Sequence, residues 1–259
     1  MSRRFLASSE RCESPDAVVV GLPVDGGVSF RAGAAQGPGA IREFSDSIES
    51  YSPRLRRDLE DVELVDLGDV DDPRALPEWS GLLVSIGGDH SITPKLVAQV
   101  ASRHDRLAVV GFDAHLDLRE EYPGDHACTY RRISETGVPC YVFGPRSGER
   151  SEWIDAPKVL AYLSADLDVT KAVEELRERP VYVTLDIDVL DPSVAPGTGN
   201  PEAGGPGFNA LLDAIERLSE LNVVACDLVE VSPPLDASGI TQAAAAVLVR
   251  EMILNFTAG

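Results

Sequence analysis

The chain has 259 residues, 44% of them hydrophobic, with 23 basic against 43 acidic side chains and a formal net charge of −20 at pH 7. A surface this acidic excludes nucleic acid and anionic membranes as partners, and no apolar run reaches membrane-spanning length. The length fits one domain over residues 1–259, and the four dispersed cysteines are expected to be free thiols in a reducing cytoplasm.

The negative charge has two compatible interpretations. It attracts a cationic substrate, or it marks an acidic surface adapted to a salt-rich cytoplasm, where salt screens the repulsion between like charges. Only three lysines accompany 20 arginines, and the acids are spread along the whole chain. This even spread favours adaptation to salt.

Short apolar runs typical of strands alternate with helical patterns along the chain. The alternation predicts a three-layer α/β/α fold with a mostly parallel central sheet. In chain order we expect strand Ala17–Leu22, helix Ala40–Ser50, strands Glu63–Asp66 and Gly81–Ile86, helix Thr93–Arg103, strands Leu107–Phe112 and Cys140–Phe143, helix Val169–Glu178, strand Val181–Leu185, helix Asn209–Glu220, strand Val223–Leu228 and helix Thr241–Asn255. The Gly- and Pro-rich stretches Gly33–Gly39 and Pro192–Gly207 are expected to be long loops.

Acidic and imidazole side chains follow directly after four of these strands. In chain order they are His90, then Asp113, His115 and Asp117, then Asp186 and Asp188, and finally Glu230. The carboxyl ends of parallel strands share one edge of a sheet, where open α/β proteins bind ligands. We therefore expect these side chains to lie together.

The spacing and charge of this set indicate two metal ions. In extended backbone, residues two apart point to the same side, so each motif can aim its polar groups at one point. Four aspartates carry −4 when ionised, a charge that two divalent cations would balance. Oxygen and imidazole ligands without thiolates favour Mn²⁺, although these residues alone leave Zn²⁺, Co²⁺ and Fe²⁺ open.

Four other aspartates lie near strand ends but have no such partners in the sequence. A lone Asp after a strand is usually a cap or a turn residue. We expect turn roles for Asp25, Asp66, Asp69 and Asp191.

These motifs resemble the arginase/agmatinase superfamily, the ureohydrolases, and most closely the archaeal-type agmatinases. The resemblance covers nearly the whole chain, through several motifs in the family order. They are Gly21–Arg31, Gly37–Arg42, Gly87–Ser91, Asp113–Asp117, His126–Ile133, Asp186–Pro192, Ala195–Gly199, Glu230–Asp236 and Ser238–Thr241.

The resemblance implies an arginase-like α/β/α fold, a homotrimer or homohexamer, and two Mn²⁺ ions per subunit. One ion would take His90, Asp113, Asp117 and Asp186, and the other Asp113, His115, Asp186 and Asp188. A manganese-activated hydroxide would attack a guanidinium carbon. Asp117 would stabilise the tetrahedral intermediate, Glu230 would hold the guanidinium, and His126 would pass a proton to the departing amine.

The residues that follow the Asp113–Asp117 motif favour agmatine, which is cleaved to putrescine and urea. Arginases carry Asn and Ser there to bind an amino-acid head group, whereas this chain has Leu118 and Arg119. Alternative functions are guanidinobutyrase, arginase, formimidoylglutamase, or a non-catalytic metal-binding homologue, which the complete ligand set argues against. The chain departs from the family pattern in a shorter segment before His126, and at Asn200 and Leu235.

Overall fold

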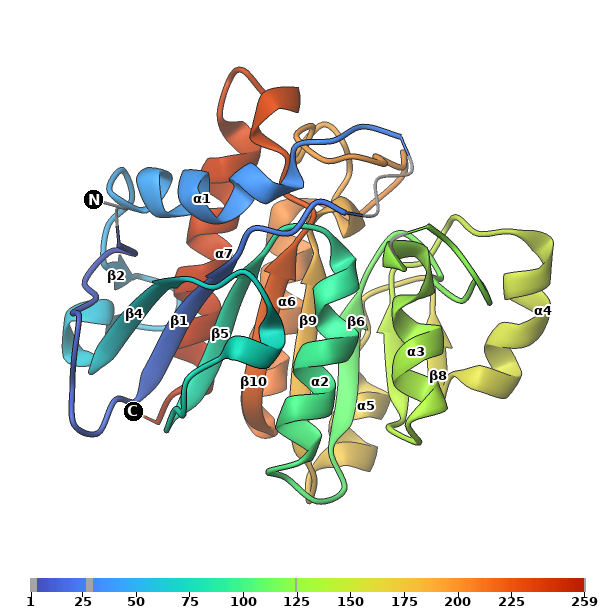
Figure 1. Ribbon diagram of the computed structural model, residues 1–259, viewed down its shortest axis with the longest axis horizontal. Coiled ribbons are helices and arrows are strands. Elements are labelled where there is room, and N and C mark those ends of the chain that lie inside the picture. Colours follow the sequence, from blue (N-terminus) through green and yellow to red (C-terminus); the bar gives the residue numbers. More distant parts are fainter. Residues whose placement is uncertain (1–3, 27–29, 124, 259) are drawn as a thin grey trace.

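A parallel sheet of eight strands forms the centre of the computed structural model, which describes residues 4–26, 30–123 and 125–258 (Figure 1). The strand order is β4-β1-β5-β10-β9-β6-β7-β8, and every neighbouring pair is parallel. The strands are β1 (Ala17–Leu22), β4 (Leu64–Asp69), β5 (Leu82–Gly87), β6 (Ala108–Phe112), β7 (Cys140–Phe143), β8 (Tyr162–Ser164), β9 (Pro180–Asp186) and β10 (Asn222–Val229), with a separate hairpin of β2 (Tyr51–Ser52) and β3 (Arg57–Asp58).

Helices cover both faces of the sheet, which gives the three layers expected from the sequence (Figure 1). On one face lie α2 (Thr93–Ala101), α3 (Thr129–Glu135) and α4 (Arg150–Val159). On the other lie α1 (Gly37–Ser45), α5 (Thr170–Leu176), α6 (Phe208–Arg217) and α7 (Ile240–Phe256). The strands are apolar on both sides because each side packs against a helical layer.

β9 illustrates how the sequence produces this arrangement. Val181, Val183 and Leu185 pack into the core beneath α5, α6 and α7, whereas Tyr182 belongs to the core beneath α2 and α3. The side chains therefore alternate with the period of two that a strand requires. No helix in the described part of the chain has the length and apolar character needed to cross a bilayer.

All the strands and helices expected from the sequence are present, with ends that differ by a few residues. The sequence patterns missed the short strands β2, β3 and β8 and the helices α3 and α4. The family motif that begins at Gly21 includes residues 27–29, which lie outside the described residues.

The prediction of a loop over Gly33–Gly39 is wrong in its second half. A 3-10 turn spans Ala34–Gln36, and α1 begins at Gly37. Pro38 lies in the first turn of α1, where its missing N–H costs nothing. A Cβ atom on Gly37 would lie 2.7 Å from the carbonyl oxygen of Val231, so glycine allows the helix start to approach the loop after β10.

The prediction that Asp66 and Asp69 are turn residues is also wrong, because both belong to β4. They form an ion pair with Arg42 of α1. Arg42 Nε lies 2.7 Å from Asp66 Oδ2, and both of these side chains are fully buried. The pair joins α1 to the sheet. Asp25 and Asp191 lie in loops, as expected.

Candidate metal centre and active site

Three neighbouring regions of the sheet edge deliver the candidate ligands. His90 begins a 3-10 turn after β5, Asp113 follows β6 directly, and Asp186 is the last residue of β9. The register pairs Phe112 of β6 with Leu185 of β9, so these two strands end together. The expected convergence of the motifs is confirmed.

The reason for the convergence differs from the expected strand alternation. β6 stops at Phe112, and Asp117 adopts a left-handed backbone conformation with φ 44°. Hydrogen-bonded turns orient the ligand side chains instead. Asp113 Oδ1 accepts a hydrogen bond from the His115 N–H at 2.7 Å, and Asp186 Oδ1 accepts one from the Asp188 N–H at 2.9 Å. One oxygen of each carboxylate fixes the turn, and the other is left to face the centre.

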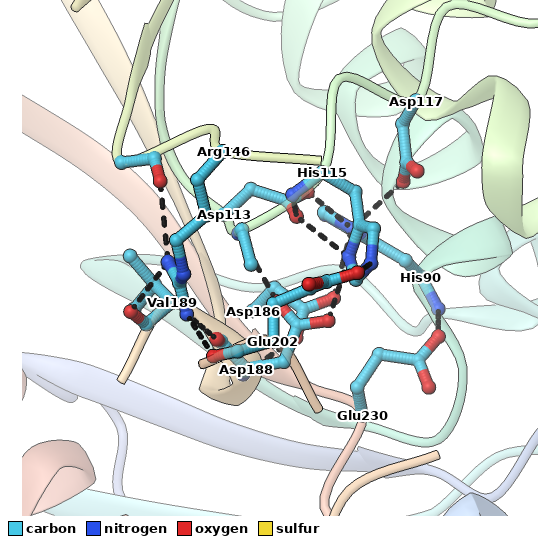
Figure 2. Close-up of polar contacts among 12 residues, drawn as sticks. His90, Asp113, His115, Asp117, Arg146, Asp186, Asp188, Val189, Glu202 and Glu230 are labelled. Carbon is cyan, nitrogen blue, oxygen red and sulfur yellow. Dashed lines mark hydrogen bonds and ion pairs between the residues drawn. The ribbon is translucent and has the colours of Figure 1, made fainter. Parts of the chain in front are cut away.

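The first group surrounds Nδ1 of His90 (Figure 2). Asp113 Oδ2 lies 3.3 Å from this nitrogen, and Asp117 Oδ2 and Asp186 Oδ2 each lie 3.4 Å from it. Both His90 Nδ1 and Asp113 Oδ2 are buried and have no hydrogen-bond partner among the described residues. A divalent cation would satisfy these atoms, and the donor set of carboxylates and imidazole suits Mn²⁺.

The second group shares Asp113 with the first. His115 Nδ1 lies 2.9 Å from Asp188 Oδ2 and 3.8 Å from Asp113 Oδ1. In each group, three ligand atoms from His and Asp lie within 4.8 Å of one another. The geometry therefore offers two adjoining positions for metal ions, with Asp113 between them.

The pKa values of this cluster are strongly displaced. Burial, and then the charge of Asp113, raises the pKa of Asp117 to about 7. Burial works to lower the pKa of His115, but Asp188 and Asp113 outweigh it and raise that pKa to about 11. Raised pKa values favour the protonated forms of these groups. Bound metal ions would displace these protons, since metal ligands must be deprotonated.

A buried network behind His90 fixes its orientation, and the sequence reasoning did not find it. His90 Nε2 lies 3.0 Å from Thr184 Oγ1, and the Thr184 hydroxyl donates to Asp227 Oδ1 at 2.6 Å. Tyr182 donates to the other oxygen of Asp227 at 2.6 Å. Because the Thr184 proton goes to Asp227, its oxygen accepts from His90 Nε2–H, which leaves Nδ1 free to bind a cation.

Two sequence signals could have found this network. Thr184 precedes Asp186 by two residues in the same strand, so both lie on one side of it. Asp227 is the one charged residue of β10.

Glu230 and His126 line a cavity of about 320 Å³ together with His115, Asp117, Asp186 and Asp188. Glu230 has φ 65°, and its Oε1 accepts a hydrogen bond from the backbone N–H of His90 at 2.8 Å. Burial, and then Asp89, raises the pKa of Glu230 to about 8. The cavity therefore brings every predicted site residue together except His90 and Asp113, which lie behind its wall.

His126 is 8% exposed, and neither of its ring nitrogens has a hydrogen-bond partner among the described residues. Its ring stands edge-on to Tyr122, with 5.1 Å between the centroids. The Arg119 guanidinium lies over the Tyr122 ring, 4.9 Å from its centroid. Burial lowers the pKa of His126, so its imidazole is neutral at pH 7.

The departures from the family pattern fall in different places. Asn200 lines the cavity, whereas Leu235 ends the short 3-10 turn Pro233–Leu235. The shortened segment before His126 includes residue 124, which lies outside the described residues.

Comparison with known proteins identifies the family. The arginase family model matches residues 15–80 and 74–254. The chain belongs to the arginase family. It is 40% identical over 277 residues to an agmatinase from Bacillus anthracis, covering 97% of this chain and 96% of the relative. It is 36% identical to an agmatinase from Pyrococcus horikoshii, covering 84% of each chain.

The fold agrees with this assignment. The crystal structure of a putative agmatinase from Clostridium difficile superposes with a TM-score of 0.88 at 31% identity, covering 95% of this chain and 99% of that one. The arginase-like fold expected from the sequence motifs is confirmed.

Proposed function

We propose that this protein is an agmatinase, which hydrolyses agmatine to putrescine and urea with two Mn²⁺ ions. The observation that carries the proposal is the pair of His/Asp groups that share Asp113 beside a cavity lined by Glu230. The agmatinases to which this chain is similar over nearly its full length support the same reaction.

We assign one ion to His90, Asp113, Asp117 and Asp186, and the other to Asp113, His115, Asp186 and Asp188. Bound divalent cations supply Lewis acidity that brings the pKa of water toward neutrality, which hydrolysis of the poorly electrophilic guanidinium requires. The role of the protein is to hold the ligands rigidly. The hydrogen bonds that fix the Asp113 and Asp186 turns serve this role.

Glu230 would bind the guanidinium group. Its carboxylate is oriented by the His90 N–H and lines the cavity, so it can accept paired N–H groups from the substrate. A guanidinium beside the carboxylate favours its ionised form, and the two charges then compensate one another.

His126 would carry a proton to the departing amine. Its neutral imidazole can accept a proton released during attack on the guanidinium carbon and donate it to the nitrogen that leaves. Asp117, also in the cavity wall, would stabilise the tetrahedral intermediate by accepting hydrogen bonds from its nitrogens.

The charge of the cavity favours a cationic substrate tail. Of the carboxylates in its lining, those of Glu149 and Glu152 are assigned neither to the metal ions nor to the guanidinium, and Arg119 is the one basic side chain other than histidine. Arg119 is itself held by Glu149, with 3.2 Å between Nη1 and Oε1. This lining favours the primary amine of agmatine over the carboxylate of 4-guanidinobutyrate.

A substrate panel tests the proposal. Agmatine, 4-guanidinobutyrate, arginine and formiminoglutamate would each be incubated with Mn²⁺-loaded protein at low and high KCl. Urea and formamide would be measured separately. We expect the highest kcat/KM for agmatine, with equal amounts of urea and putrescine. Binding of two Mn²⁺ ions without hydrolysis of any of these compounds would instead support the non-catalytic alternative.

The homotrimer or homohexamer, the cytoplasmic location and the adaptation to high salt stay predictions. Light scattering after size-exclusion chromatography at low and high KCl measures the oligomeric state. The same series, followed by circular dichroism, measures whether folding depends on salt.

A further inference from the structure

The ring of His115 is flanked by carboxylates on both of its nitrogens. Nδ1 faces Asp188 Oδ2 at 2.9 Å, and Nε2 lies 3.7 Å from Glu202 Oε1 (Figure 2). We propose that Glu202 is a positioning residue for the second metal ion: it orients the His115 imidazole, and Arg146 holds the loop that carries it. The inference rests on the dinuclear centre proposed above.

A carboxylate beside the ring nitrogen that does not bind the metal has a defined effect on a histidine ligand. At 3.7 Å the Glu202 carboxylate acts on the ring through its negative charge, which favours the tautomer with the proton on Nε2 and leaves the Nδ1 lone pair free for a cation. It also restrains rotation of the ring. His115 needs such a restraint, because its side chain is 22% exposed whereas that of His90 is 1% exposed. For His90 the buried Thr184 performs this function.

Arg146 connects the loop of Glu202 to the metal centre. Its Nη2 donates to the backbone carbonyl of Glu202 at 2.8 Å and to that of Asp188 at 2.9 Å. Its Nη1 donates to the carbonyls of Gly144 and Val189 at 3.2 and 3.1 Å. One guanidinium therefore joins the end of β7, the turn after β9 and the long loop at residues 192–207 (Figure 2).

The backbone of Arg146 adds a further link, because its N–H donates to the carbonyl of Ala114 at 2.9 Å. Ala114 lies between the ligands Asp113 and His115. Arg146 thus contacts the backbone beside three ligands of the second position without itself contacting a metal or the substrate.

The long loop is shaped to receive this guanidinium. A Cβ atom on Gly205 would lie 2.6 Å from Arg146 Nη2 and 2.7 Å from the carbonyl oxygen of Val189, so no side chain fits there. The adjacent Gly204 donates its N–H to Asp191 Oδ2 at 2.9 Å. The backbone on which Glu202 stands is therefore fixed, although the Glu202 side chain is 39% exposed.

The test compares Mn²⁺ binding by Glu202→Gln and by the unmodified protein. Free Mn²⁺ counted by electron paramagnetic resonance, together with calorimetric titration, gives the affinity of each ion separately. We expect one ion to bind unchanged and the other, at the His115 position, to bind about 10- to 100-fold more weakly, the usual effect of losing an outer-shell partner. Glu121→Gln removes the same charge from an exposed position near the cavity and should leave both affinities unchanged.

Arg146→Lys keeps a positive charge but cannot reach all three segments, and we expect it to weaken binding of the same ion. Should this variant fail to fold, Glu202→Gln still decides the matter, because its side chain is not part of the core. Two Mn²⁺ ions bound by Glu202→Gln with unchanged affinities would overturn the inference. If the unmodified protein bound only one ion, the dinuclear centre itself would be refuted, and this inference with it.

Discussion

Replacing Glu230 with Gln removes the charge proposed to hold the guanidinium while keeping the shape of the side chain. The amide oxygen can still accept the His90 N–H that Glu230 Oε1 accepts at 2.8 Å, so the loop should stay in place. Two unit charges about 4 Å apart attract by about 4 kcal/mol at an effective dielectric constant of 20. Part of this is offset by desolvation, which leaves a loss of about 3 kcal/mol, or roughly 10²-fold in kcat/KM.

The assay is the initial rate of urea release from agmatine over a range of concentrations. Because the guanidinium carries its full positive charge when the substrate binds and loses it as hydroxide adds to the carbon, much of the loss should be a rise in KM. Metal content of the variant would be measured alongside, with Glu121→Gln as the charge-matched control. A Glu230→Gln protein that holds two metal ions and keeps kcat/KM within threefold of the unmodified enzyme would refute the assignment.

Three further predictions follow from the pKa shifts and the buried ion pair. Burial raises the pKa of Glu230 to about 8, well above its unfolded value of about 4.3. The folded metal-free protein therefore keeps a proton that the unfolded chain releases, so its free energy of unfolding should fall as pH rises from about 4.5 to 8. Urea denaturation across this pH range should show a flatter slope for Glu230→Gln. An unchanged slope would count against the raised pKa of Glu230. His126→Asn should lower kcat by about 10²- to 10⁴-fold without loss of metal, whereas near-normal turnover would remove its proton-transfer role. Arg42→Met leaves Asp66 buried without its cation and should cost about 3–5 kcal/mol of unfolding free energy; a loss under 1 kcal/mol would contradict the account of this pair.

The position of the metal centre could be predicted because it depends on sheet topology. In a parallel sheet with crossover helices, the residues after each strand must meet at the carboxyl edge. The apolar runs that end before His90, Asp113 and Asp186 were enough to identify those strands. No knowledge of side-chain conformation was required.

How the ligands are oriented could not be predicted in the same way. The expected alternation of side chains applies only while the backbone is extended, and the strands end before Asp117 and Asp188. Beyond that point, hydrogen bonds from the Asp113 and Asp186 side chains to nearby N–H groups decide the geometry. Such turns depend on atoms that a pattern of residue types does not specify.

Long-range pairs were missed for a related reason. Arg42 and Asp66 are 24 residues apart, and their pairing exists only because α1 packs beside β4. Glu202 is one of 43 acidic residues, and only the folded loop brings it near His115. A sequence with so many acids gives no sign of which of them are held in place.

The most direct test of the central claim is urea release from agmatine as a function of metal occupancy. Metal would be removed with a chelator, and Mn²⁺ returned in measured equivalents at fixed salt. We predict no activity without metal, a steep recovery as the second equivalent binds, and putrescine equal to urea throughout. Full activity in the metal-free protein, or no agmatine hydrolysis with two Mn²⁺ ions bound, would contradict the account.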